Sequence, residues 1–190
     1  MTAADIKKQI IKEMITPFFK NNGFSKKGVK YFNVTDFLII EAEIQSQRYY
    51  TNKNIKNFRI NINRLPNINS NATSRLVSFG FHTISFSETS WITIDGNMNF
   101  EILKSKMKVE IDGALLFIAE SNNLNRMIAN AEEQLEYFKK AILSSESKLE
   151  QESNTQYWID TLKLSIERNN ERINMINDWL RIARGYAYQS

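Results

Sequence analysis

The spacing of apolar residues changes near Gly96, and this change constrains the fold more than any other feature of the 190-residue chain. Before Gly96, apolar and polar residues alternate, which is typical of strands with one buried face. After Gly96, apolar residues recur every three or four positions, which is typical of amphipathic helices. We therefore predict an α+β fold: an antiparallel sheet with an N-terminal helix, followed by a C-terminal antiparallel helical hairpin. The predicted parts are the α+β sheet domain core over 1–96, a helix packing on the sheet over 97–122, and the hairpin over 123–190.

The hairpin is predicted from two long seams of apolar residues. In the first seam the spacing alternates between four and three residues, as at the a and d positions of a coiled coil. Its members are Leu124, Ile128, Ala131, Leu135, Phe138, Ile142, Ser145 and Leu149. The second seam consists of Trp158, Leu162, Ile166, Asn169, Ile173, Ile176, Leu180 and Ala183. Asn169, the polar member of the second seam, either fixes the register from a buried position or lies at the edge of the seam and faces water.

The remaining elements are predicted from local spacing and from glycine and proline. Residues 3–22 form an amphipathic helix whose apolar stripe, at three- and four-residue spacing, ends at Phe18. Pro17 bends or shortens this helix, and Asn22-Gly23 ends it. We predict strands over 30–34, 37–47, 56–64, 78–86 and 90–95, and a loop over 65–74. Gly113 lies within the helix over 97–122 and weakens it by about 1 kcal/mol relative to alanine, so that we expect a break there.

Two neighbouring predicted strands each have one polar face. The polar positions are Glu41, Glu43, Gln45 and Gln47 on the first strand, with Arg59 and Asn61 on the second. Pairing of the strands places the carboxylates near the guanidinium of Arg59, so an ion-paired face is one interpretation. The other is a carboxylate pair for acid–base chemistry or a divalent cation, because Glu41 and Glu43 lie two residues apart on the same face.

Composition excludes several classes of site. The chain has no cysteine, which excludes disulfides, thiolate nucleophiles, zinc ribbons and iron–sulfur clusters. Its one histidine, His82, is the only candidate base for a Ser-His-Asp triad, and we interpret it as a hydrogen-bonded strand residue. Walker, GxGxxG, GxSxG and HExxH motifs do not occur. We therefore expect no catalytic residue, no metal site and no cofactor, and we favour a protein that is not an enzyme.

Basic residues concentrate between positions 20 and 75, where there are 10 Lys and Arg against 3 Asp and Glu, in a chain of net charge +4. The candidate basic patch consists of Lys26, Lys27, Lys30, Arg48, Lys53 and Lys56. Such a patch neutralises phosphates while neighbouring tyrosines stack on bases, which makes nucleic-acid binding the alternative function. Lysines at loops and strand edges also prevent edge pairing, and that interpretation stays open.

Four short motifs follow the N-terminal helix. They are Gly23-Phe24-Ser25-Lys26-Lys27-Gly28, Tyr31-Phe32, Ile44-Gln45-Ser46-Gln47 and Phe58-Arg59-Ile60-Asn61. In order and spacing they resemble the bacterial family known as domain of unknown function 4304, over about residues 3–120. The resemblance implies an α+β domain in which the stretch from Gly23 to Gly28 is a turn into the first strand and the Gln-containing strand lies at the sheet centre. It implies no reaction, because the family has no established activity.

These features predict a cytosolic bacterial module that binds another macromolecule, with a protein as the expected partner. Self-association through the C-terminal helices is the other expected use of that surface. The large side chains that favour this prediction are Tyr137, Trp158, Trp179, Tyr186 and Tyr188. We expect no membrane association, because no apolar run approaches the roughly 20 residues of a spanning helix. Charges within the first apolar pattern are also unlike a secretory signal.

Overall fold

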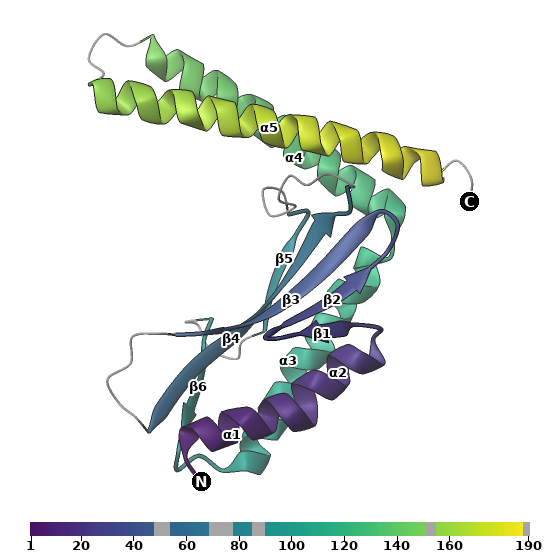
Figure 1. Ribbon diagram of the computed structural model, residues 1–190, viewed down its shortest axis with the longest axis vertical. Coiled ribbons are helices and arrows are strands. Elements are labelled where there is room, and N and C mark those ends of the chain that lie inside the picture. Colours follow the sequence, from purple (N-terminus) through teal and green to yellow (C-terminus); the bar gives the residue numbers. More distant parts are fainter. Residues whose placement is uncertain (48–53, 69–77, 85–89, 151–154, 188–190) are drawn as a thin grey trace. The chain divides into compact units, whose positions relative to one another are not determined.

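The computed structural model describes residues 1–47, 54–68, 78–84, 90–150 and 155–187. It confirms the predicted fold class, with an N-terminal helix, an antiparallel sheet and C-terminal helices (Figure 1). The chain divides into two compact units, of which unit 1 comprises residues 1–64 and 80–122 and unit 2 comprises residues 65–79 and 123–190. The segment 65–79 thus belongs with the C-terminal helices, although apolar spacing gives no sign of this grouping.

The N-terminal helix consists of α1 (Ala3–Ile10), the single π-helical turn η1 (Ile11–Ile15) and α2 (Thr16–Asn21). A capping box begins it, because the side chains of Thr2 and Asp5 each accept a hydrogen bond from the other's backbone N–H. Gly23 follows the helix at φ +79°, the left-handed conformation that glycine adopts without strain. The predicted end at Asn22-Gly23 is therefore confirmed.

The π turn moves the buried stripe of this helix by one residue. In η1 the N–H of Thr16 donates to the carbonyl of Ile11, five residues back, directly before Pro17. Ile10 and Ile15, five residues apart, are consequently both buried, and the next buried side chain is Phe19. The prediction that the apolar stripe ends at Phe18 was wrong, because it assumed regular α-helical spacing along the whole helix.

The sheet of unit 1 comprises β1 (Ser25–Lys27), β2 (Lys30–Val34), β3 (Leu38–Ser46), β4 (Ile55–Pro66), β5 (Phe81–Ile84) and β6 (Ile92–Asp95). The strand order is β1-β2-β3-β4-β5, and β6 pairs with β4. β3, the Gln-containing strand, lies inside the sheet as expected. Two expectations were wrong. Ser25–Lys27 is an edge strand rather than part of a turn, and β4 continues through Leu65 and Pro66, where a loop was predicted.

One face of the sheet is apolar, and α1, α2 and α3 (Phe100–Ser121) lie on that side (Figure 1). The side chains of β3 and β4 on this face are at most 1% exposed at Leu38, Ile40, Ala42, Phe58, Ile60 and Ile62. Phe19 of α2 stacks on Tyr31 of β2 with 4.7 Å between ring centroids. From α3, Leu103, Met107 and Ala114 are fully buried. The two helical segments therefore close the core of unit 1 from one side.

α3 is continuous, and the expected break at Gly113 was wrong. The side chain of Asn99 caps its start by accepting hydrogen bonds from the N–H groups of Glu101 and Ile102. Ala114 and Ile118 beyond the glycine remain buried. Packing of these residues offsets the roughly 1 kcal/mol that glycine costs in a helix interior.

Unit 2 contains α4 (Leu124–Leu149) and α5 (Gln156–Ala187), which pack along one another as the predicted antiparallel hairpin. Glu132 near the start of α4 accepts a 2.6 Å hydrogen bond from Arg184 near the end of α5, as antiparallel helices require. Asn169 is buried, and its Oδ1 accepts a 3.2 Å hydrogen bond from Arg172. This settles the two alternatives for Asn169 in favour of the interior. Trp158 departs from the predicted seam, because it is 55% exposed.

The segment before β5 contributes to the core of unit 2. Phe79 lies against Trp179 of α5 with 4.6 Å between ring centroids, and both side chains are almost completely buried. Gln134 of α4 donates a hydrogen bond to the carbonyl of Ser78. Trp179 therefore serves the interior of unit 2, although the sequence indicated it as a residue for docking.

Replacement of Leu135 by aspartate tests the seam of the hairpin. Leu135 is partly buried on α4, so a carboxylate there loses water without gaining a partner and should cost roughly 2–3 kcal/mol. We expect a lower thermal midpoint and weaker helical circular dichroism than in the wild type. Leu143→Asp is the matched control, because Leu143 lies on the same helix and is 65% exposed. Equal effects of the two substitutions would contradict the seam.

Candidate functional site

The second face of the sheet is polar and holds the residues that the sequence singles out. Strand alternation sends Glu41, Glu43 and Gln45 away from the side of Ala42, which faces the helices. The register of β2 on β3 places Lys30 opposite Glu43 and Phe32 opposite Glu41. β4 contributes Arg59 and Asn61 to the same network through hydrogen bonds to β3. We call this surface, Lys30, Glu41, Glu43, Gln45, Gln47, Asn57, Arg59 and Asn61, the polar face.

The two carboxylates of the polar face share a lysine. The Nζ atom of Lys30 lies 2.9 Å from Oε2 of Glu41 and 3.6 Å from Oε2 of Glu43. The side chain of Glu41 is only 10% exposed, and that of Lys30 is 18% exposed. The expectation that Arg59 neutralises the pair was wrong, because sequence alone does not give the register of β2. Lys30 therefore neutralises both carboxylates, and this arrangement stabilises the sheet.

Arg59 organises the other half of the polar face. Its Nε donates to Oε1 of Gln45 at 2.7 Å, and Nδ2 of Asn61 donates to the same oxygen at 3.1 Å. The guanidinium carbon of Arg59 lies 4.7 Å from the ring centroid of Trp91. Sequence reasoning missed Trp91. Phe58 pairs with Ile92, and this register, which no sequence pattern gives, places Trp91 beside Arg59.

The amide side chains extend this network to the start of β4. Nδ2 of Asn57 donates to Oε1 of Gln47 at 2.7 Å, and Asn57 is buried. Within the described residues, Oδ1 of Asn57 and Oδ1 of Asn61 are buried without a hydrogen-bond partner. The side chains of the polar face are thus held mainly by hydrogen bonds to one another. In the described part of the chain, no three His, Cys, Asp or Glu side chains gather to hold a metal ion.

The lysines of the candidate basic patch do not share one surface. Lys26 pairs with Tyr31, lies over its ring and donates to Thr16, so it belongs to the side of the helices. Lys27 and Lys30 are opposite one another on the polar face. Lys56 pairs with Ile94, whose side chain is fully buried. Arg48 and Lys53 lie outside the described residues.

Lys7 in the last turn of α1 and Lys56 of β4 form a pair of neighbouring lysines. Nζ of Lys7 donates to Oγ of Ser46 and lies 5.4 Å from the ring centroid of Phe58. Burial, together with the nearby charge of Lys56, lowers the pKa of Lys7 below its ordinary value. This proximity was not predicted, because it depends on how α1 crosses the ends of β3 and β4.

His82 lies on β5 on the side of the helices. Its ring stacks on Phe117 of α3 with 5.5 Å between centroids, and its Nε2 is buried without a hydrogen-bond partner among the described residues. The hydrogen bond expected for this histidine is therefore absent at Nε2. Burial lowers the pKa of His82 below its ordinary value of 6.5, so the ring is neutral at pH 7.

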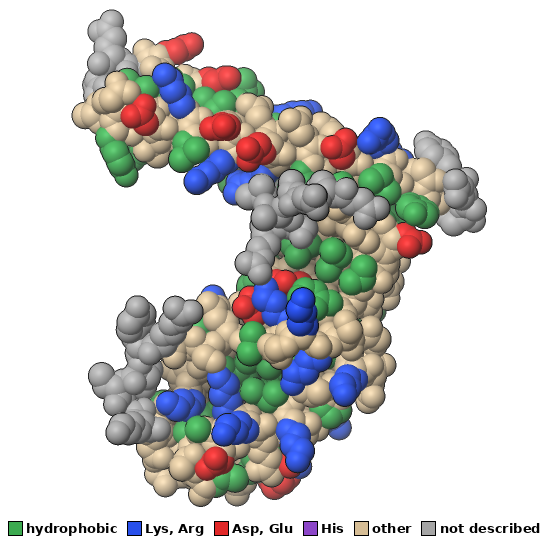
Figure 2. Space-filling model, viewed as in Figure 1, with side chains coloured by type: hydrophobic (Ala, Val, Ile, Leu, Met, Phe, Trp, Pro, Cys, Tyr) green, Lys and Arg blue, Asp and Glu red, His purple; other side chains and the backbone are tan. Residues whose placement is uncertain are grey.

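Large apolar side chains are exposed where α4 ends and α5 begins. We call Leu143, Tyr157, Trp158 and Leu164 the closed end of the hairpin. Their exposed fractions are 65% for Leu143, 75% for Tyr157, 55% for Trp158 and 43% for Leu164. Figure 2 shows hydrophobic side chains on this end of the hairpin, interspersed with acidic and basic ones. Of the other predicted docking residues, Tyr137 and Tyr186 are exposed and Tyr188 lies outside the described residues.

Comparison with family models, with curated proteins and with solved structures finds no match to this chain. The resemblance to domain of unknown function 4304 therefore stays a prediction. Within the described ranges, no helix combines the length and the apolar character needed to cross a membrane. Fold alone does not determine function, which depends on the chemistry of particular surfaces.

Removal of the lysine tests whether the two carboxylates depend on it. Lys30→Met leaves Glu41 and Glu43 side by side on β3 without their cation, and we expect it to lower the free energy of unfolding by about 1–2 kcal/mol. Glu41→Gln should cost less than about 1 kcal/mol, because Lys30 keeps Glu43 and the amide still accepts a hydrogen bond. In denaturant titrations, the double variant should lose less than the sum of the two. Additive losses would contradict a shared pair.

Protonation of His82 should destabilise the fold at acid pH. Because its folded pKa lies below the unfolded value of 6.5, His82 contributes stability above pH 6.5 that is lost as pH falls through the folded pKa. His82→Phe keeps the ring stacked on Phe117 and removes the titrating group. Thermal unfolding at pH 7.5 and at pH 5 should therefore show a smaller drop for the variant than for the wild type. Equal drops would contradict the assignment.

Proposed function

We propose that this chain is a non-enzymatic module that binds a protein partner through the closed end of its C-terminal hairpin. The observation that carries the proposal is Trp158. It is the first member of the predicted second seam, yet it is 55% exposed. Exposed tryptophan and tyrosine are the residue types that dominate protein–protein binding energy when a partner covers them.

The neighbours of Trp158 make the closed end more than one exposed ring. Tyr157 directly precedes it, and Leu164 lies seven residues after Tyr157 on the same side of α5. Leu143 adds a further apolar side chain from α4, 65% exposed. The nearby charges are mixed, with Glu146 and Lys148 on α4 and Asp160 and Lys163 on α5. A protein with an apolar groove and a rim of mixed charge fits this surface best.

The polar face favours a module that is not an enzyme, because its charged side chains already have partners within the face. Its carboxylates are committed to Lys30, and its arginine to Gln45 and Trp91. A general base would need a carboxylate or imidazole directed at a substrate. We regard the polar face as a stable scaffold, and the cytosol stays our expectation for the compartment.

Nucleic-acid binding receives less support than protein binding. A phosphate-binding surface needs several cations on one side of the fold. Lys26 lies on the side of the helices and Lys30 on the polar face, where two carboxylates neutralise it. We therefore do not advance the basic segment as the binding site.

Substitution at the closed end, with a matched control, tests the proposal. The full chain carrying Tyr157→Ser and Trp158→Ser is compared with a control carrying Glu167→Ser and Arg168→Ser, two exposed positions further along α5. A protein recovered from native cells with the wild type and identified by mass spectrometry is then purified and titrated calorimetrically against all three. We expect the closed-end variant to bind at least about tenfold more weakly, the loss that hot-spot truncation causes, and the control to bind like the wild type.

Two results would overturn the proposal. The first is equal affinity of the closed-end variant and the wild type for every partner recovered, or recovery of no protein that depends on these two side chains. The second is retention of the wild type on lipid vesicles that the double substitution abolishes, because the aromatic rings would then serve a membrane interface. Circular dichroism of each variant establishes that the hairpin is intact.

A further inference from the structure

α3 has a second apolar stripe on the side turned away from the sheet. Ile102 is 57% exposed, Val109 is 71% exposed and Leu116 is 70% exposed. Successive members are seven residues apart, so they lie within about 40° of one another around the helix axis. The opposite side of the same helix buries Leu103 and Met107. A helix of one small unit needs only one such stripe, and the second calls for a partner.

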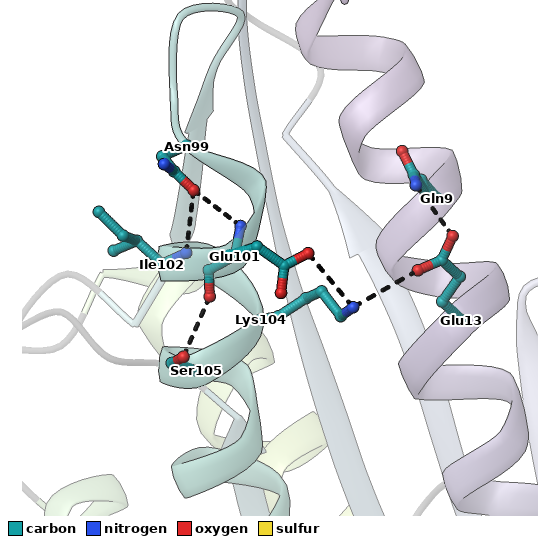
Figure 3. Close-up of polar contacts among 7 residues, drawn as sticks. All are labelled: Gln9, Glu13, Asn99, Glu101, Ile102, Lys104 and Ser105. Carbon is teal, nitrogen blue, oxygen red and sulfur yellow. Dashed lines mark hydrogen bonds and ion pairs between the residues drawn. The ribbon is translucent and has the colours of Figure 1, made fainter.

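The contacts of Lys104 show how the outer stripe is oriented. Nζ of Lys104 lies 3.9 Å from Glu13 of η1 and 3.5 Å from Glu101. In Figure 3 the side chain of Ile102 points away from the helix that carries Glu13, whereas Lys104 extends toward it. α3 is therefore anchored to the N-terminal helix on one flank, and the stripe remains on the surface.

The residues along the stripe are arranged symmetrically about Val109. Ile102 and Leu116 lie seven positions to either side, and the small residues Ser105 and Gly113 lie four positions to either side. The charged residues have the same symmetry with opposite sign. Lys106 and Asp112 are three positions from Val109, and Lys108 and Glu110 are one position from it. Within three residues of Val109, α3 thus has its lysines before Val109 and its carboxylates after it.

We propose that the chain self-associates through α3, with two copies packed antiparallel and related by a twofold axis at Val109. Turning one copy end to end brings Val109 onto Val109 and Ile102 onto Leu116, so that the same patch serves both copies. The lysines of one helix then lie beside the carboxylates of the other, with Lys106 near Glu110 and Lys108 near Asp112. Parallel packing would set lysine against lysine, so charge specifies the direction.

The small residues allow the two helices to approach. Helices pack at axial separations of roughly 8–10 Å when the residues at the contact permit it. Apart from the adjoining residues and backbone of α3 itself, no heavy atom of the described residues lies within 4 Å of the position that a Cβ would take at Gly113. Ser105 faces Gly113 of the other copy in this arrangement. Two helices of 22 residues with three apolar anchors each give an interface near the lower limit of about 1,000 Å², so dimerisation should depend on concentration.

Charge reversal tests the proposal with the full-length chain in sedimentation equilibrium over a concentration series. One variant, Lys106→Glu with Lys108→Glu, makes the flanks acidic, and the other, Glu110→Lys with Asp112→Lys, makes them basic. We expect each variant to be monomeric at concentrations where the wild type is dimeric, and their equimolar mixture to form a heterodimer. The fourfold variant that carries both exchanges should dimerise like the wild type.

Two single substitutions locate the interface. Val109→Lys places two lysines at the twofold axis and should abolish the dimer. Leu143→Lys, at an equally exposed apolar residue of the hairpin, should leave it unchanged, and this separates the proposal from the function proposed for the closed end. A wild type that is monomeric up to about 1 mM, which corresponds to less than about 4 kcal/mol of binding, would overturn it. So would a dimer that persists in both charge variants, or one lost only in Leu143→Lys.

Discussion

Along β3 and β4, alternate side chains are removed from water beneath α1, α2 and α3, and the pleat then sends their neighbours to the opposite face. Leu38, Ile40, Phe58 and Ile60 are at most 1% exposed, and burial of such side chains stabilises a fold by about 1.5–3 kcal/mol each. The polar face exists because this apolar face is covered. A shift of one residue in either strand would turn carboxylates and amides into the core.

The spacing of apolar and polar residues was sufficient to predict the helices, the strands and the two faces of β3, because these depend on residues close together in the sequence. The partner of Glu41 was not predictable in the same way. It depends on the register between β2 and β3, which places Lys30 opposite Glu43. Trp91 was not predicted for the same reason, since it lies beside Arg59 only because β6 pairs with β4. Contacts between strands are long-range facts that local spacing does not contain.

The tryptophans of α5 show that apolar spacing along a helix does not predict which side chains are buried. Trp158 and Trp179 are three heptads apart, yet one is 55% exposed and the other is completely buried. The difference comes from Phe79, which packs on Trp179 from a segment that precedes the sheet strand β5. α3 presents the converse case. The sequence predicted that this helix packs on the sheet, but its outer stripe was not predicted, because the inner and outer stripes both fit helical spacing.

The π turn at Ile11–Ile15 gives the N-terminal helix an unusual tolerance to length. Ile10 and Ile15 point to the core together only because hydrogen bonds in this turn span five residues instead of four. A chain shortened by one residue in this turn could close it as ordinary α-helix and still keep both isoleucines inward. Related chains that differ in length by a single residue here would therefore share the same core, and gaps at this point would mark no change of architecture.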